Sequence, residues 1–144
     1  IANENKVSTI SVEADNIEEL LNFAKKEKIA LTVVGPEIPL VEGIVDKFNE
    51  AGLRCFGPTR EAAKLEGSKV YAKEFFKRHG IPSAKYKVFS DFYSATNFLK
   101  MRNFPMVIKV DGLAAGKGVS IVKNFTEALS ILDDLGYKVK ISGG

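Results

Sequence analysis

The sequence predicts an α/β protein: a parallel sheet with helices on its faces, followed by a region of α+β character. Over the first 58 residues, segments typical of strands and helices alternate in the order β-α-β-α-β. Beyond about residue 60 the pattern changes, and two apolar strands flank a glycine-bearing loop at 111–117. In such alternating sheets the crossovers are right-handed, and ligands bind beyond the carboxyl ends of the strands.

The first half contains three expected strands and two expected helices. Residues 7–12, 29–34 and 53–56 are rich in β-branched or continuous apolar residues, and the last two runs end at Gly-Pro pairs. Asn16 with Glu19 three residues later has the spacing of a capping box. Apolar residues at helical spacing then predict one helix from Ile17, Leu20, Leu21 and Ala24, and another from Val41, Ile44, Val45 and Phe48. Gly52 is placed to end the second helix in a left-handed conformation.

The second half begins with a helix over 68–79, which Gly80 and the following Pro82 should end. A strand is expected at 86–89, and Asp91 can cap a helix with Phe92, Ala95 and Leu99 on one face. Strands at 106–110 and 118–122 flank the loop. A helix from near Thr126 and a strand at 137–141 complete the predicted order. The boundary between the two halves is expected between Gly57 and Lys69.

Composition excludes several classes of protein. Hydrophobic residues make up 45% and charged residues 27% of the 144, so the chain can build a core. The net charge is +3 with the signs intermixed, which does not indicate a nucleic-acid partner. Cys55 is the only cysteine, so neither an internal disulfide nor a CxxC metal pair is possible. No apolar run suits a bilayer and no signal peptide is evident, so a cytoplasmic location is expected.

The segment 106–119 carries the clearest chemical signal. An apolar strand presents Lys109 near its end, and a loop of small residues lets backbone N–H groups approach an anion. Lys117 in that loop can reach a terminal phosphate. The loop is not a Walker A motif, because Gly118 follows Lys117 and the next element is a strand. Taken alone, the pattern fits a solvated hairpin turn as well as a phosphate site.

Four segments together resemble the phosphoribosylamine–glycine ligases of the ATP-grasp superfamily. They are GPEIPL at 35–40 with the two valines before it, FGPT at 56–59, LEGSKVYAK at 65–73 and DGLAAGKGV at 111–119. They occur in the family's order, and the resemblance covers about residues 5–135. It implies a pre-ATP-grasp (Rossmann-like) region over 1–60. The start of an ATP-grasp α+β domain follows over 61–144, with its small ATP-binding lobe from about residue 84.

The resemblance also implies an activity. Family members join glycine to 5-phosphoribosylamine while ATP is split to ADP and phosphate, through an acyl phosphate of glycine, in purine biosynthesis. The expected small-molecule partners are therefore glycine, 5-phosphoribosylamine and ATP, with Mg²⁺ as the metal. The residues that match the family's nucleotide site are Lys69, Lys109, Gly112, Gly116, Lys117 and Gly118. The residues that match its phosphoribosylamine pocket are Gly35, Pro36 and Glu37.

Several residues also have simpler interpretations. Lys69 fits a solvated charge in the first turn of a helix, and Glu37 fits a helix-capping carboxylate. Asp133 and Asp134 suit the solvated face of a helix better than a metal site, and His79 suits the end of a helix dipole.

The chain departs from the family pattern at both ends. The family's first strand with its glycine-rich turn has no counterpart, nor do the adenine-binding hinge, the Glu and Asn that hold Mg²⁺, and the glycine site. No metal ligand and no catalytic residue is assigned, and the chain is expected to be a fragment of a larger enzyme. Two alternatives stay open: another ATP-grasp carboxylate–amine ligase, or a non-catalytic nucleotide-binding module.

Overall fold

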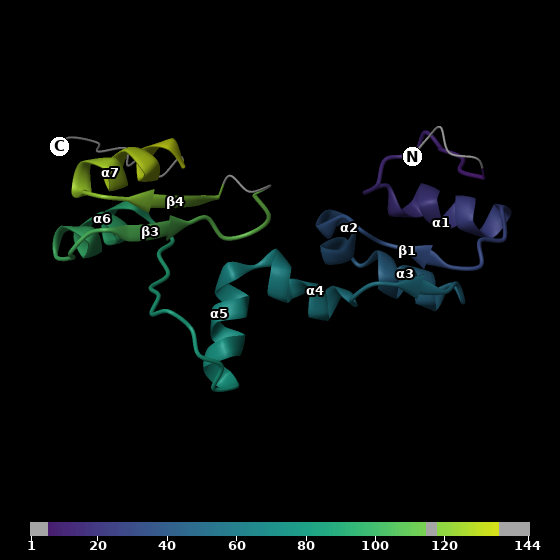
Figure 1. The fold of residues 1–144 in the computed structure, drawn as a ribbon, viewed down its shortest axis with the longest axis horizontal. Coiled ribbons are helices and arrows are strands. Elements are labelled where there is room, and N and C mark those ends of the chain that lie inside the picture. Colours follow the sequence, from purple (N-terminus) through teal and green to yellow (C-terminus); the bar gives the residue numbers. More distant parts are fainter. Residues whose placement is uncertain (1–5, 115–117, 136–144) are drawn as a thin grey trace, which may run out of the picture. The chain divides into compact units, whose positions relative to one another are not determined.

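The computed structural model describes residues 6–114 and 118–135. The chain divides into two compact units between Gly67 and Ser68 (Figure 1). Each unit has its own apolar core. One unit contains a parallel strand pair and the other an antiparallel hairpin. The predicted α/β class is confirmed.

The first unit alternates strands and helices along the chain. Its elements are α1 (Ile17–Lys26), β1 (Thr32–Val33), α2 (Glu37–Glu42), α3 (Ile44–Glu50), β2 (Cys55–Phe56) and α4 (Arg60–Gly67). The strands β1 and β2 are parallel, with Thr32 opposite Cys55 and Val33 opposite Phe56. Helix α4 runs across the boundary predicted at residue 60 and belongs to this unit.

Local sequence signals explain how the helices of this unit begin and pack. The Asn16 side chain accepts a hydrogen bond from the Glu19 N–H at 3.2 Å, which confirms Asn16 as the N-cap. The reciprocal contact of a capping box is altered, because the Glu19 carboxylate accepts from the Asn16 side-chain amide at 2.8 Å while the Asn16 backbone N–H binds the Glu13 carbonyl. The buried core comes from the apolar faces of α1 and α3, namely Ile17, Ala24, Ile44, Val45 and Phe48. Cys55 is half-buried beside this core, and burial raises the pKa of its thiol.

Four expectations for the first unit need correction. Residues 7–12 form no strand, and the strands expected at 29–34 and 53–56 are each two residues long. A strand forms only where a neighbour supplies hydrogen bonds, and in the described residues only β1 and β2 pair here. The second helix is interrupted: α2 begins at Glu37, inside the segment expected to be a loop, and ends at Gly43, whose φ of 92° is left-handed.

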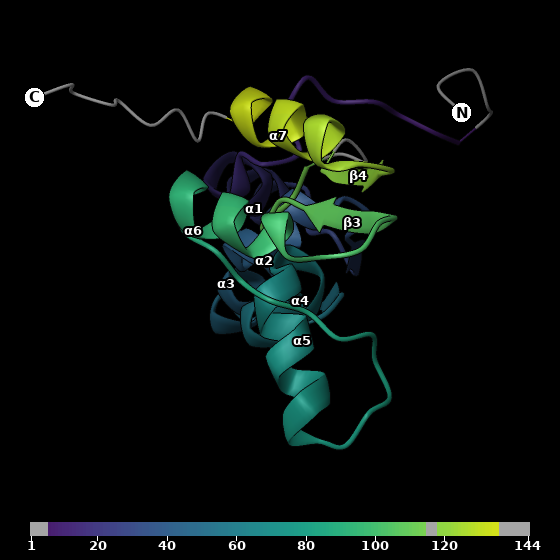
Figure 2. The same ribbon diagram turned by 90° about the vertical axis from the view of Figure 1, so that its left-hand side faces the viewer.

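The second unit is built around a hairpin. Its elements are α5 (Lys69–Arg78), α6 (Phe92–Lys100), β3 (Met106–Lys109), β4 (Val119–Val122) and α7 (Phe125–Asp134). The strands β3 and β4 are antiparallel, with Met106 opposite Val122 and Lys109 opposite Val119. Figure 2 shows β3 and β4 side by side, and the segment 81–90 as an extended connection from α5 to α6.

Helices α6 and α7 pack together against one face of the hairpin. Asp91 caps α6, as predicted, by accepting from the Ser94 N–H at 2.8 Å, and Asn124 caps α7 in the same way. The buried core consists of Ala95, Leu99, Val122, Ala128 and Leu132. Half-buried Met106 and Ile108 join this core from β3, so the opposite face of the hairpin is left uncovered by α6 and α7.

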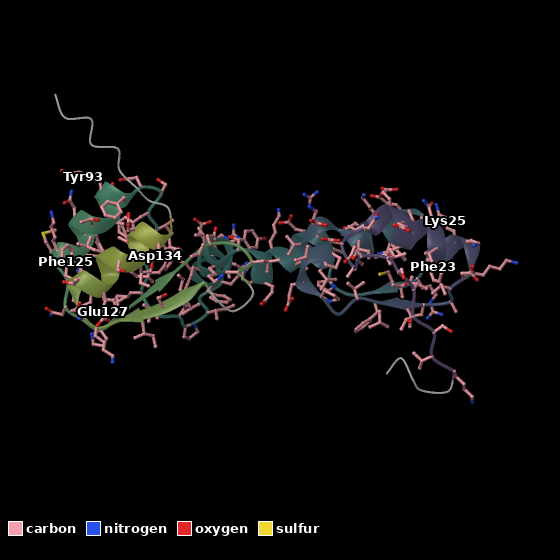
Figure 3. All side chains as sticks on the ribbon, turned by 90° about the horizontal axis from the view of Figure 1, so that it is seen from above. Phe23, Lys25, Tyr93, Phe125, Glu127 and Asp134 are labelled. Carbon is pink, nitrogen blue, oxygen red and sulfur yellow. The ribbon has the colours of Figure 1, made fainter. Side chains whose placement is uncertain are left out.

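Other expectations for this unit have mixed outcomes. The segment 86–89 lies extended without ladder partners, so the strand predicted there is absent. The strand predicted at 137–141 lies outside the described residues. His79 caps the end of α5 and stacks on the Phe75 ring, and Asp133 and Asp134 are exposed on α7, where Figure 3 labels Asp134. Within the described residues, no helix has the length and apolar character needed to cross a bilayer.

Candidate functional site

The uncovered face of the β3–β4 hairpin carries one lysine among aliphatic side chains. Because side chains alternate along a strand, Val107 and Lys109 share the face of β3 that points away from the core. Val119 and Ile121 lie opposite them on β4, and Ile121 is 70% exposed. An apolar surface with a single cation on a strand suits a ligand with a flat apolar part and a negative charge.

The root of the loop that joins these strands is closely packed. The Val110 N–H donates to the Gly118 carbonyl at 2.8 Å, which extends the hairpin by one pair beyond β3 and β4. Gly112 has a φ of 91°, a conformation that side chains strongly disfavour. A Cβ placed on Gly118 would lie 2.5 Å from the Ala114 methyl carbon, so this buried position has no room for a side chain. Gly116 and Lys117 lie outside the described residues.

Lys69 is bound to the loop root. Its Nζ donates to the Gly112 carbonyl at 2.7 Å, and its side chain is partly buried at the start of α5. Lys69 is therefore not the freely solvated lysine of the simpler interpretation. The contact joins residues 43 positions apart and places an ammonium group beside the residue that follows Asp111.

Asp111 also links the loop root to the start of α5, through a second set of hydrogen bonds. Its carboxylate accepts from the Ser68 hydroxyl at 3.1 Å and 3.2 Å and from the Val70 N–H at 3.1 Å. Burial of the carboxyl acts to raise its pKa, but the hydrogen bonds from Val70, Ser68, Gly112 and Lys69 together outweigh it, and the pKa of Asp111 is lowered. Asp111 is thus held as a carboxylate against the first turn of α5.

The lowered pKa predicts a pH-dependent contribution to stability. A carboxyl whose pKa falls on folding stabilises the fold above its unfolded-state pKa, about 3.9, and this contribution is lost as the pH falls through the folded-state pKa. We expect Asp111→Asn to lower the free energy of unfolding of the 144-residue chain at about pH 6 and to have a much smaller effect near pH 2. Denaturant unfolding of both proteins across this range measures the difference. A difference that does not vary with pH would contradict the assignment.

The other predicted residues lie at the carboxyl ends of β1 and β2, in the first unit. Gly35 and Pro36 follow β1, and Glu37 lies exposed in the first turn of α2. The Val34 N–H donates to the Phe56 carbonyl at 3.1 Å, so the chain leaves both strands at the same edge. A Cβ on Gly57 would lie 2.8 Å from a Leu40 methyl carbon, so the residue after β2 packs directly against α2.

Two further features of the described residues bear on where a ligand could bind. Within residues 6–114 and 118–135, no three His, Cys, Asp or Glu side chains converge on a metal position. A shallow hollow of about 200 Å³ lies between α5 and the segment after it, away from the hairpin. Lys73 on its wall already donates to the Ser83 hydroxyl and the Ala84 carbonyl. The hollow is lined by Lys73, Lys77, Ile81, Ser83, Ala84, Lys85 and Tyr86.

The structure therefore brings some of the predicted site residues together, but not all of them. Lys69, Lys109, Gly112 and Gly118 belong to one unit and surround the root of one loop. Gly35, Pro36 and Glu37 belong to the other unit. The sequence interpretation assigned no role to Ser68 or Asp111, although a serine at the start of a predicted helix is a recognisable capping signal.

Two family models together match residues 1–142 of the chain. "Phosphoribosylglycinamide synthetase, N domain" matches residues 1–66, and "Phosphoribosylglycinamide synthetase, ATP-grasp (A) domain" matches residues 67–142. Among curated relatives, the phosphoribosylamine–glycine ligase of Chlorobaculum tepidum is 55% identical over 139 residues, which are 96% of this chain and 32% of that protein. That of Xanthomonas axonopodis pv. citri is 48% identical over 134 residues, 93% of this chain and 31% of that protein.

Two solved structures resemble the chain, at different levels of sequence identity. The phosphoribosylamine–glycine ligase of Thermotoga maritima superposes with a TM-score of 0.64 at 31% identity, over 93% of this chain and 30% of that one. The biotin carboxylase domain of Hydrogenobacter thermophilus 2-oxoglutarate carboxylase has a TM-score of 0.72 at 22% identity, over 88% of this chain and 29% of that one. The second likeness shows a shared fold. The chain spans about a third of the length of these two curated relatives, 31% of one and 32% of the other.

Proposed function

The chain belongs to the phosphoribosylglycinamide synthetase family, and from this premise we propose that it forms part of an ATP-dependent ligase that joins glycine to 5-phosphoribosylamine. In this proposal the second unit supplies part of the nucleotide site, and the carboxyl edge of β1 and β2 supplies part of the phosphoribosylamine pocket. The products are glycinamide ribonucleotide, ADP and phosphate, in a cytoplasmic step of purine biosynthesis.

The observation that carries the proposal is the position of Lys109 on the uncovered hairpin face. The aliphatic side chains around it suit the flat face of a purine, and its ammonium group suits a phosphate or a purine nitrogen. Lys69 adds a second cation at the loop root, where its Nζ is held by the Gly112 carbonyl. Phosphoryl transfer is accelerated mainly by positioning and by neutralisation of charge, which fixed lysines and backbone N–H groups supply.

The chemistry explains why such a site is needed. A carboxylate is a poor electrophile, so one of its oxygens must first become a leaving group. Attack of the glycine carboxylate on the γ-phosphorus forms an acyl phosphate and releases ADP. The amine then attacks the acyl carbon and phosphate leaves. Exclusion of water from the site protects the acyl phosphate from hydrolysis.

The described residues offer groups that suit ATP, and they supply no cluster of three metal-ligating side chains. Two lysines and a glycine-bearing loop root suit a polyphosphate, whereas no acidic cluster is present in residues 6–114 and 118–135 to hold a divalent cation. No step is therefore assigned to a metal ligand of this chain. Gly116 and Lys117 remain part of the proposed nucleotide site on the strength of the sequence motif.

The activity is tested with the complete protein that contains this chain. With ATP, Mg²⁺ and 5-phosphoribosylamine, we expect ADP release that depends on glycine and on the amine. Bicarbonate, alanine and aspartate in place of glycine should give no more ADP than the reaction without a carboxylate.

Each other outcome indicates a different function. Release that depends on another carboxylate would indicate a different carboxylate–amine ligase of the same fold. Binding of ATP without release of ADP under any of these conditions would indicate a non-catalytic nucleotide-binding module.

A further inference from the structure

We propose that Asp111 is a positioning residue for Lys69, because it fixes the first turn of α5 against the end of β3 and so holds the Lys69 ammonium where the nucleotide phosphates bind. The inference rests on the proposed function for the role of Lys69. It assigns a role to a side chain that touches neither substrate nor nucleotide in the proposed site.

The contacts form a closed ring around Lys69. The Asp111 carboxylate binds Ser68 and Val70, the residues directly before and after Lys69. The Lys69 Nζ binds the carbonyl of Gly112, the residue directly after Asp111. The lysine is therefore fixed at its backbone by Asp111 and at its ammonium group by the next residue in the loop.

The helix start makes this ring rigid. Ser68 is the N-cap of α5, and its hydroxyl accepts from the Tyr71 N–H at 3.0 Å while it donates to Asp111. The Val70 N–H belongs to the first turn, where backbone N–H groups have no partner within the helix. Asp111 supplies that partner, and its negative charge is favourable at the positive end of the helix dipole.

The same arrangement keeps the carboxylate compatible with an anionic ligand. The Asp111 oxygens accept hydrogen bonds from Ser68 and Val70 at the start of α5, and these donors partly neutralise the negative charge of the carboxylate. The Lys69 ammonium is held on the side of Gly112, at the loop root. Without Asp111 the lysine would keep its charge and lose its fixed position, and a cation that must be ordered on binding contributes less affinity.

A double-mutant cycle in the complete protein tests this role. The variants are Asp111→Ala, Lys69→Met and the two combined, with the dissociation constant for ATP measured by calorimetry. We expect Asp111→Ala to weaken binding about 10-fold and Lys69→Met at least as much. The double variant should bind as Lys69→Met does, because Asp111 acts through that lysine. Asp111→Asn keeps one acceptor oxygen and should fall between wild type and Asp111→Ala.

A purely structural role predicts a different pattern. Asp111→Ala would then weaken ATP binding by the same factor in the wild-type and Lys69→Met backgrounds, and that result overturns the proposal. Unchanged ATP affinity in both Asp111→Ala and Asp111→Asn also overturns it. If Asp111→Ala does not fold, the cycle with Asp111→Asn decides in the same way.

The control and the wild type separate this inference from the proposed function. Asp133→Asn removes an exposed carboxylate of α7 and should leave ATP affinity at the wild-type value. Failure of the wild-type protein to bind ATP contradicts the proposed function itself. Normal binding and turnover by wild type, with Asp111 variants that match it, contradicts only the positioning role.

Discussion

Lys109→Ala in the complete protein is expected to lower turnover by roughly 100- to 1,000-fold while the protein stays folded. Lys109 is the one charged side chain on the uncovered face of the described hairpin, and it lies one residue before the loop root. In the proposed site, this variant would remove a cation beside the phosphates and with it stabilisation of the charge that moves during phosphoryl transfer. Steady-state release of ADP with glycine and 5-phosphoribosylamine measures the effect, and ATP affinity should fall with it.

The fold should tolerate this change because Lys109 is exposed. Its side chain points away from the core, and the backbone pairing with Val119 does not depend on it. Lys100→Ala is a matched control, since Lys100 is an exposed lysine in the last turn of α6. Both variants should melt close to the wild-type temperature, and only Lys109→Ala should lose activity. Wild-type turnover and ATP affinity in Lys109→Ala would exclude Lys109 from the site.

The helices were the most predictable part of the fold because their signals are local. The N-cap residues Asn16 and Asp91 are each followed by apolar residues at helical spacing, and α1 and α6 begin where these signals place them. Gly52 and Gly80 adopt positive φ after α3 and α5, as predicted.

Helices α4 and α2 were not predicted, for different physical reasons. Helix α4 buries only Ala63, and two alanines and one leucine are too few apolar residues to stand out as a helix face. Helix α2 begins inside a segment that contains Pro36 and Pro39, which resembles a loop. Pro39 is tolerated because it lies in the first helical turn, where a backbone N–H has no acceptor within the helix.

Strands and the site depend on partners distant in the chain, which explains why they were harder to predict. Residues 7–12 and 86–89 have suitable composition, but the described residues provide no strand to pair with them. The motif around Lys109 was recognisable because its strand and loop are contiguous. The bond from Lys69 to Gly112 spans 43 residues, and no local pattern predicts it.

Phe48→Ala is expected to lower the stability of the first unit by about 3–5 kcal/mol, the usual cost of truncating a fully buried phenylalanine. Phe48 is 1% exposed and belongs to the core cluster formed by α1 and α3. This core supports the unit in which Gly35, Pro36 and Glu37 lie. Denaturant unfolding of the 144-residue chain, followed by circular dichroism, measures the loss.

Phe56→Ala provides the matched comparison, because it removes the same side chain from the uncovered face of the β1–β2 pair. Phe56 is 69% exposed, so its truncation creates no cavity and should cost about 0.5 kcal/mol or less. The large difference between the two variants follows from the position of the core on the α1–α3 side of the sheet. Equal losses would show that Phe56 is as deeply packed in solution as Phe48, and the proposed core would then be wrong.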